Sequence, residues 1–180
     1  MIEKLLQLLK PVSDERQNIA SYTYALIDGV KHKMLWSDLE EGLLEYDLLF
    51  REESLRKELF TVAPYLVHME FGTPEAEEQS IQILKQCYGA NSTIFISSDL
   101  EFEDVLDRMR EMFYLYTHEG IKGYMRLYDP KIFHDYISQK DRNIQDALFD
   151  GIVCYWCEEP DNISMIWQYL KKYTSIPIQI

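Results

Sequence analysis

The sequence of 180 residues lacks most features that identify the commonest functional classes. It has no apolar run near the 18 or more residues of a membrane-spanning helix. Its three cysteines are an odd number, unlike the disulfide framework of a small secreted domain. Glu3 and Lys4 interrupt the apolar run that a signal peptide would need at the start. We therefore expect a cytoplasmic protein in a reducing compartment.

Basic residues are also scarce, because 18 Lys and Arg stand against 31 Asp and Glu and give a formal net charge of −13. Proteins that bind DNA or RNA draw their affinity from Lys and Arg that neutralise phosphates, so this balance argues against a nucleic-acid partner. The same reasoning argues against an anionic membrane surface. Surplus acid is typical of a soluble chain, and attraction to a basic partner is its functional alternative.

Motifs that carry catalysis are missing as well. The sequence contains no Gly-rich phosphate-binding loop, no G-x-S-x-G and no H-E-x-x-H. The acid pairs Glu40–Glu41 and Glu52–Glu53 are consecutive, so on a helix they diverge instead of converging on a substrate. A carboxylate pair that only the fold brings together stays open as an alternative. We expect a protein without catalytic residues, cofactor or metal.

Cys154 and Cys157 have the C-x-x-C spacing of redox and zinc sites. A redox pair needs its first thiol at a helix N-terminus, whereas these two lie on or just after a predicted strand, where residues three apart point to opposite faces. A structural zinc ion needs two further ligands, and the remaining cysteine and the four histidines are scattered singly. We predict buried, unreactive thiols.

Segments with strand and helix patterns alternate along the chain. This order predicts an α/β fold: a single domain with a mixed central β-sheet, one antiparallel hairpin and helices packed on the faces of the sheet. We divide the chain into an N-terminal helix and connector at 1–20, an α/β domain at 21–158, and a short C-terminal helix and tail at 159–180. Strands are expected at 22–27, 65–69, 93–96, 113–117, 124–128 and 152–156. Helices are expected at 1–10, 30–44, 73–89 and 163–172, after a capping box at 98–101, and from Asp129 onward.

The predicted hairpin has two chemically different faces. Tyr114 and Tyr116 share one face of its first strand, and Tyr124, Arg126 and Tyr128 share one face of its second. The opposite side is aliphatic. Tyr and Arg dominate the energetics of protein interfaces, so the candidate partner-binding residues are Tyr114, Tyr116, Tyr124 and Arg126. The alternative is a sheet covered on both faces, with the tyrosines lying under helices.

Asp129 and Pro130 have a structural explanation, because Asp can cap a helix and Pro suits its first position. Arg126 has none within its own segment. An arginine inside an aromatic strand usually pairs with a carboxylate, and Asp28, after the first strand, is one candidate.

Four short motifs resemble, in order and spacing, landmarks of one protein family. They are Tyr24-Ala25-Leu26-Ile27-Asp28-Gly29, Ala63-Pro64-Tyr65-Leu66-Val67, Arg126-Leu127-Tyr128-Asp129-Pro130, and the strand that ends at Trp156 after Phe149-Asp150-Gly151. The family is that of the effector adaptor-chaperones of bacterial type VI secretion, first described as a domain of unknown function, and the resemblance runs from about Tyr22 to Glu158. The motif residues look like determinants of the fold: Asp28, Gly29, Pro64, Tyr65, Arg126, Tyr128, Asp129, Pro130 and Trp156.

The resemblance implies a function in the cytoplasm. Such proteins bind a toxic effector and help to load it on the VgrG spike, and they have no catalytic residues to carry over. Members commonly have a larger C-terminal lobe, whereas here one helix and a short tail are expected after Trp156. The strongest alternative is an immunity protein, also small and acidic, which binds a toxin and abolishes its activity.

Overall fold

The computed structural model describes residues 1–10, 22–32, 34–52, 56, 59–116, 119–138, 142–171 and 174–180. Seven strands form one sheet in the order β2-β3-β1-β4-β7-β8-β9, and β5 and β6 form a separate two-stranded sheet. The strands are β1 (Tyr22–Asp28), β2 (Tyr46–Leu48), β3 (Pro64–His68), β4 (Thr93–Ser98), β5 (Tyr114–Tyr116), β6 (Lys122–Tyr124), β7 (Ile152–Glu159), β8 (Asn162–Leu170) and β9 (Thr174–Gln179). The helices are α1 (Ile2–Leu9), η1 (Gly29–Lys31), α2 (Leu35–Glu40), α4 (Pro74–Cys87), α5 (Phe102–Phe113), α6 (Pro130–Ser138) and α7 (Arg142–Leu148).

The α/β character is confirmed, but the expectation of a mixed sheet is wrong, because each neighbouring pair in the described sheet is antiparallel. β3 and β4 run in the same direction and α4 connects them, which is the sequence pattern of a parallel unit. β1 lies between them and runs opposite to both. The crossover therefore produces no parallel pair.

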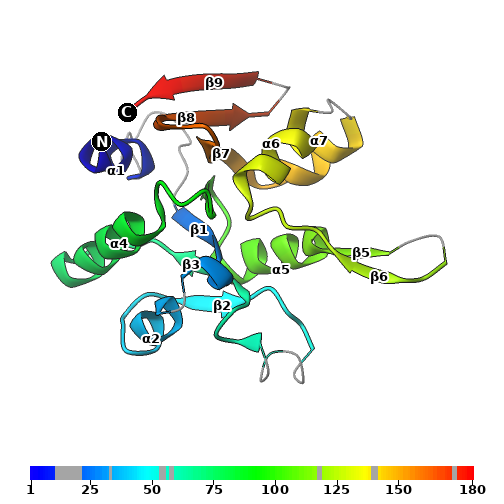
Figure 1. The fold of residues 1–180 in the computed structure, drawn as a ribbon, viewed down its shortest axis with the longest axis horizontal. Coiled ribbons are helices and arrows are strands. Elements are labelled where there is room, and N and C mark those ends of the chain that lie inside the picture. Colours follow the sequence, from blue (N-terminus) through cyan, green and yellow to red (C-terminus); the bar gives the residue numbers. More distant parts are fainter. Residues whose placement is uncertain are drawn as a thin grey trace.

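Helices cover both faces of the sheet (Figure 1). α1, α2 and α4 lie on one side, and α5, α6 and α7 lie on the other. The register explains this, since Thr23 donates to the Leu9 carbonyl of α1, and its neighbour Tyr24 meets Phe102 of α5 on the opposite face. The central strands are consequently buried on both sides, as the continuous apolar runs of β1 and β4 require.

Two predicted helices have different limits in the structure. Among its described residues, the segment 30–44 is helical only at η1 and α2, and the Asp28 side chain accepts from Val30 N at the start of the separate 3₁₀ turn. The capping box at 98–101 is wrong. Ser98 Oγ accepts from Leu100 N and donates to the Gly151 carbonyl, and α5 begins after Glu101 without a side-chain cap. The apolar stripe of α5 is buried as predicted.

The hairpin forms, but in a different register from the one predicted. Tyr114 pairs with Tyr124 and Leu115 with Gly123, so the second strand ends where the prediction began it. Met125 N still donates to the Phe113 carbonyl at 2.7 Å, and the chain then leaves the hairpin and turns into α6. The hairpin is not part of the main sheet, and it is not the only one, since β7, β8 and β9 are consecutive antiparallel neighbours.

The predicted C-terminal helix at 163–172 is wrong, because this segment forms β8, followed by β9. Met165, Trp167 and Tyr169 carry apolar side chains to one face, and Ile166 and Leu170 do so on the other. Two apolar faces on one segment resemble a helical stripe. Pairing with the strongly strand-forming β7 decides the outcome. The predicted connector at 11–20 lies outside the described residues.

Within the described ranges, no helix combines the length and apolar character that crossing a membrane requires.

Candidate functional site

Three of the four sequence motifs meet around Asp28, at the end of β1. Asp28 pairs with Pro64 across β1 and β3, and it is 4% exposed. A Cβ at Gly29 would collide with the Ala63 carbonyl oxygen and lie 2.8 Å from the Tyr65 ring, so only glycine fits there. These contacts explain why the first two motifs have their residues, and they identify them as parts of the fold.

The third motif joins the same cluster through Arg126. Its Nη2 lies 3.9 Å from Asp28 Oδ2, as predicted, and 3.0 Å from Asp129 Oδ2. Asp129 also caps α6, since its Oδ1 accepts from Lys131 N and Ile132 N. Burial raises the pKa of the neighbouring Tyr128, and the Asp28 carboxylate adds to this rise. Arg126 thus ties the start of α6 to the end of β1.

The fourth motif lies elsewhere. The Trp156 indole donates to Ser97 Oγ at 3.1 Å, and Trp156 stands opposite Phe95 in the centre of the sheet. Cys154 and Cys157 are buried and free, and they point to opposite faces of β7, as expected. Burial raises the pKa of both thiols, which keeps them protonated.

The candidate binding residues on the hairpin are only partly brought together. Tyr114 is buried; its hydroxyl donates to Glu52 and accepts from Arg51 N. Tyr124 is 45% exposed and stacks on Phe113 with ring centroids 5.1 Å apart. Arg126 follows β6 and pairs with Asp28 and Asp129 instead of joining the tyrosines of the hairpin.

The basic residue beside the hairpin tyrosines is Lys122, and not Arg126 as predicted. Lys122 Nζ lies 3.9 Å from the centroid of the Tyr114 ring and pairs with Glu52. The side chain of Tyr116 lies outside the described residues. The tyrosines whose side chains are described are therefore mainly part of an aromatic cluster at the base of the hairpin.

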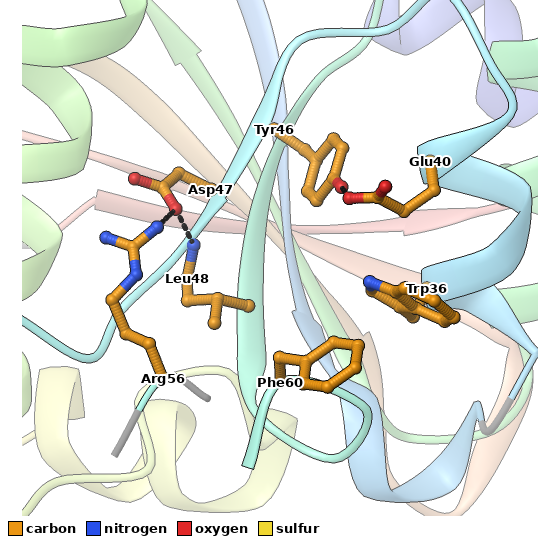
Figure 2. A pocket seen from close by; sticks show the side chains of 7 residues that line it. All are labelled: Trp36, Glu40, Tyr46, Asp47, Leu48, Arg56 and Phe60. Atoms are coloured by element: carbon orange, nitrogen blue, oxygen red, sulfur yellow. Dashed lines mark hydrogen bonds and ion pairs between the residues drawn. The ribbon is translucent and has the colours of Figure 1, made fainter. Parts of the chain in front are cut away.

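A pocket lies at the β2 edge of the sheet (Figure 2). This edge pocket has a volume of about 370 Å³. Its residues come from α2, from β2 and from the segment before β3, and sequence reasoning did not select any of them: Trp36, Glu40, Tyr46, Asp47, Leu48, Arg56 and Phe60.

Aromatic rings form the walls of the edge pocket. Trp36 and Phe60 meet edge to face with ring centroids 4.7 Å apart. The Tyr46 ring stands across from them, and its hydroxyl donates to the Glu40 carboxylate at the rim, as Figure 2 shows. Burial, followed by this carboxylate, raises the pKa of Tyr46. Flat apolar walls with a polar rim suit a side chain that is apolar along its length.

The charged residues on the other side of the edge pocket are held by one another. Asp47 pairs with Arg56 through one carboxylate oxygen and with Arg110 Nη2, at 2.8 Å, through the other. Arg110 is 9% exposed and also donates to the Leu48 carbonyl at 2.7 Å. These bonds fix the position of β2 relative to α5 and give the pocket a preformed wall.

The edge pocket rests on a motif residue. Tyr65 is fully buried and donates to the Phe60 carbonyl, and its ring centroid lies 6.1 Å from that of Tyr46. Burial raises the pKa of Tyr65 to about 12, so its hydroxyl remains a donor. The sequence contains no specific signal for this pocket, because a half-buried aromatic residue such as Trp36 in a short amphipathic segment is common in globular proteins.

Both outer strands of the sheet are protected against pairing with another strand. On β2, Leu48 N donates to Asp47 Oδ1 and its carbonyl accepts from Arg110, so neither group is free for a partner. On β9, Pro177 lacks an N–H, and the Gln179 carbonyl accepts from Lys4. Such edges disfavour strand addition, so recognition at this sheet would rely on side chains.

Among the described residues, no group of three or more His, Cys, Asp or Glu side chains is placed to hold a metal ion.

Residues 23–147, more than half of the chain, match the family model described as "Domain of unknown function (DUF4123)". No curated protein and no solved structure matches the chain.

Proposed function

Because the chain belongs to the family described as the domain of unknown function DUF4123, we propose that it is a non-catalytic adaptor-chaperone that binds a type VI secretion effector. It holds the effector in the cytoplasm and aids its loading on the VgrG spike. The resemblance of the four motifs supports this assignment. The partners are proteins, in keeping with the net charge of −13, and not nucleic acids or membranes.

The observation that carries the proposal is the edge pocket. It lies within the matched residues and is built on the motif residue Tyr65. Its walls are aromatic, and its carboxylates at Glu40 and Asp47 already have partners within the chain. A preformed pocket with apolar walls and engaged charges suits the anchor side chain of a protein partner.

Co-expression tests the proposal. The chain would be purified by an affinity tag together with the large protein encoded beside it, and the eluate would be sized. We expect a stable complex in which the chain holds a non-catalytic region of the effector and the effector keeps its toxicity. Failure of the two chains to elute together would contradict the proposal.

The second candidate is an immunity protein, which the acidic, compact character of the chain also suits. An immunity protein would bind the catalytic domain of a toxin and abolish its activity. Measuring the toxin's activity in the purified complex separates the two functions, because only the immunity function predicts its loss.

A further inference from the structure

A second hollow lies on the other side of α2 from the edge pocket. This acidic hollow has a volume of about 380 Å³ and lies between the C-terminal turn of α2 and the helix α4. Four acidic residues line it, with no basic residue among its lining: Asp38, Glu41, Glu75 and Glu78. Trp36 and Glu40 of the same short helix line the edge pocket, so α2 is a ridge shared by the two sites.

Exposed apolar side chains accompany the ridge. Met34, just before α2, is 68% exposed, and Leu43, just after it, is 67% exposed. Both belong to the helix expected at 30–44, but α2 spans only Leu35–Glu40, so Met34 precedes it and Leu43 follows it. Leu43 lines the acidic hollow and Met34 precedes the first turn of α2, so both ends of the ridge offer apolar surface to a partner.

The acidic hollow has a fixed shape. Gln79 of α4 accepts from Leu43 N at 2.7 Å and Leu44 N at 3.2 Å, and it donates to the Asp38 carbonyl at 3.1 Å. Gln86 donates to Asp38 Oδ2 at 2.9 Å. The turn after α2 is therefore tied to α4, and a partner would meet a preorganised surface.

The acids of this hollow are poorly compensated. Within the described ranges, no ion pair involves Glu41, Glu75 or Glu78, and all three are exposed. Repulsion among like charges is relieved when a cationic partner approaches. The chain's overall charge of −13 attracts the same kind of partner from a distance.

We propose that the edge pocket and the acidic hollow form one docking surface, the α2 ridge, for a basic amphipathic segment of a partner protein. An apolar side chain of the segment enters between Trp36 and the Tyr46 ring, and its Lys and Arg side chains lie over Glu41, Glu75 and Glu78. This inference rests on the proposed function, because it names the chemistry of the effector segment that the adaptor would hold. The protected sheet edges leave recognition to side chains of this kind.

Two synthetic peptides of about 18 residues test the α2 ridge directly. One is an amphipathic helix of Leu and Lys, and its twin has Glu in place of every Lys. Fluorescence anisotropy would measure the affinity of the full chain for each. We expect saturable binding of the basic peptide and none of the acidic twin, and affinity that falls as salt rises.

Variants locate the binding. Trp36→Ala in the edge pocket and the double variant Glu41→Lys/Glu78→Lys in the hollow should each weaken binding about tenfold or more. The matched control Glu111→Lys/Asp135→Lys changes the net charge equally on the helices of the opposite face and should stay within about twofold of wild type. Thermal melting of each variant separates a loss of contact from a loss of fold.

Several outcomes would overturn the α2 ridge: no binding of the basic peptide, equal binding of the acidic twin, or an equal loss in the control variant. The same variants applied to the co-purified partner separate this inference from the proposed function. A partner that binds all variants equally refutes the ridge and leaves the adaptor function standing. If no partner co-purifies, the adaptor function fails, and the peptides still decide the ridge.

Discussion

The two halves of the central sheet differ in how their strands are covered. β3, β1 and β4, within the matched family region, are buried almost throughout. In β9, at the far end of the β7-β8-β9 meander, Ile178 alone is partly buried and the other residues are exposed. β9 is the outer strand of the sheet and pairs only with β8, whereas β3, β1 and β4 have a neighbour on each side, so its edge position contributes to the contrast.

The matched half and the meander also differ in what they contribute to the structure. The matched half is constrained on both faces, and its motif residues meet at Asp28 and support the edge pocket through Tyr65. The meander adds a layer of core through β7 and β8 and closes the sheet with a protected edge. Under the proposed function the binding surface lies on the matched half, which also holds the most buried strands, and the meander extends this core.

Gly29→Ala should have the largest effect on stability, because it disrupts the contact between the first two motifs. A Cβ would meet the Ala63 backbone, which cannot move without displacing β3. We expect a loss of about 4 kcal/mol in the free energy of unfolding, measured by urea denaturation. The control Gly72→Ala, with no atom within 4 Å of its added Cβ, should change stability by less than about 0.5 kcal/mol. Equal effects would mean that the motif contact is not a constraint.

Ile166→Ala tests the meander's share of the core. Ile166 of β8 is fully buried, so truncation should cost about 3.5 kcal/mol. Ile176 of β9 is 41% exposed, and Ile176→Ala should cost less than about 1 kcal/mol. The unfolding free energy of both variants would be measured by thermal and chemical unfolding. If Ile176→Ala lost as much stability as Ile166→Ala, β9 would be covered in solution and the contrast between the halves would disappear.

Glu158 lies where the two halves meet, and it predicts a pH effect. Its carboxylate is 1% exposed and accepts from Gly89 N and Asn91 N, at 2.9 and 3.3 Å. Burial raises its pKa from 4.5 to about 7. The contribution of this group to stability is therefore full below about pH 4.5 and is lost as pH rises through 7, a fall of about 3 kcal/mol.

Glu158→Gln isolates this effect. The side-chain amide keeps an acceptor for the two backbone N–H groups and does not ionise. The unfolding free energy of wild type minus that of the variant should decrease between pH 5 and pH 8.5. A constant difference over this range would contradict the raised pKa.

Arg126→Ala should have the smallest effect on the fold and none on partner binding. The side chain is 49% exposed and pairs with Asp129 and, at a longer distance, with Asp28, so we expect a loss of about 1 kcal/mol. The affinity for the co-purified partner should stay within about twofold of wild type. Unchanged melting with lost binding would instead make the surface around Arg126 a contact site.

The buried strands could be predicted from the sequence, β7 among them, whereas the limits of α2, the register of the hairpin and β8 could not. β1, β3, β4 and the apolar stripe of α5 follow from β-branched runs and from helical spacing, because local preference and tertiary packing agree there. β8 was predicted as a helix because both of its faces carry apolar side chains. Only its pairing with β7 decides between the two periods, and pairing is not visible in a local window.

The site shows the same limit. The pairing of Arg126 with Asp28 could be predicted as one candidate, because an arginine among aromatic residues usually pairs with a carboxylate. The edge pocket could not, because Trp36, Tyr46 and Phe60 come from three separate segments without a shared spacing. Tyrosines are frequent in interfaces, but two of the hairpin tyrosines already have contacts within the chain. Tyr124 stacks on Phe113, and Tyr114 donates to the Glu52 carboxylate.

Hydrogen–deuterium exchange on the purified complex tests most directly whether the α2 side of the matched half is the binding surface. The backbone amides of the free chain and of the chain bound to its co-purified partner would be compared. We expect protection on binding at residues 34–43 and 59–62, with the meander at 162–170 and 174–179 unchanged. Protection confined to the meander or to the hairpin at 114–124, with 34–43 unchanged, would contradict the account.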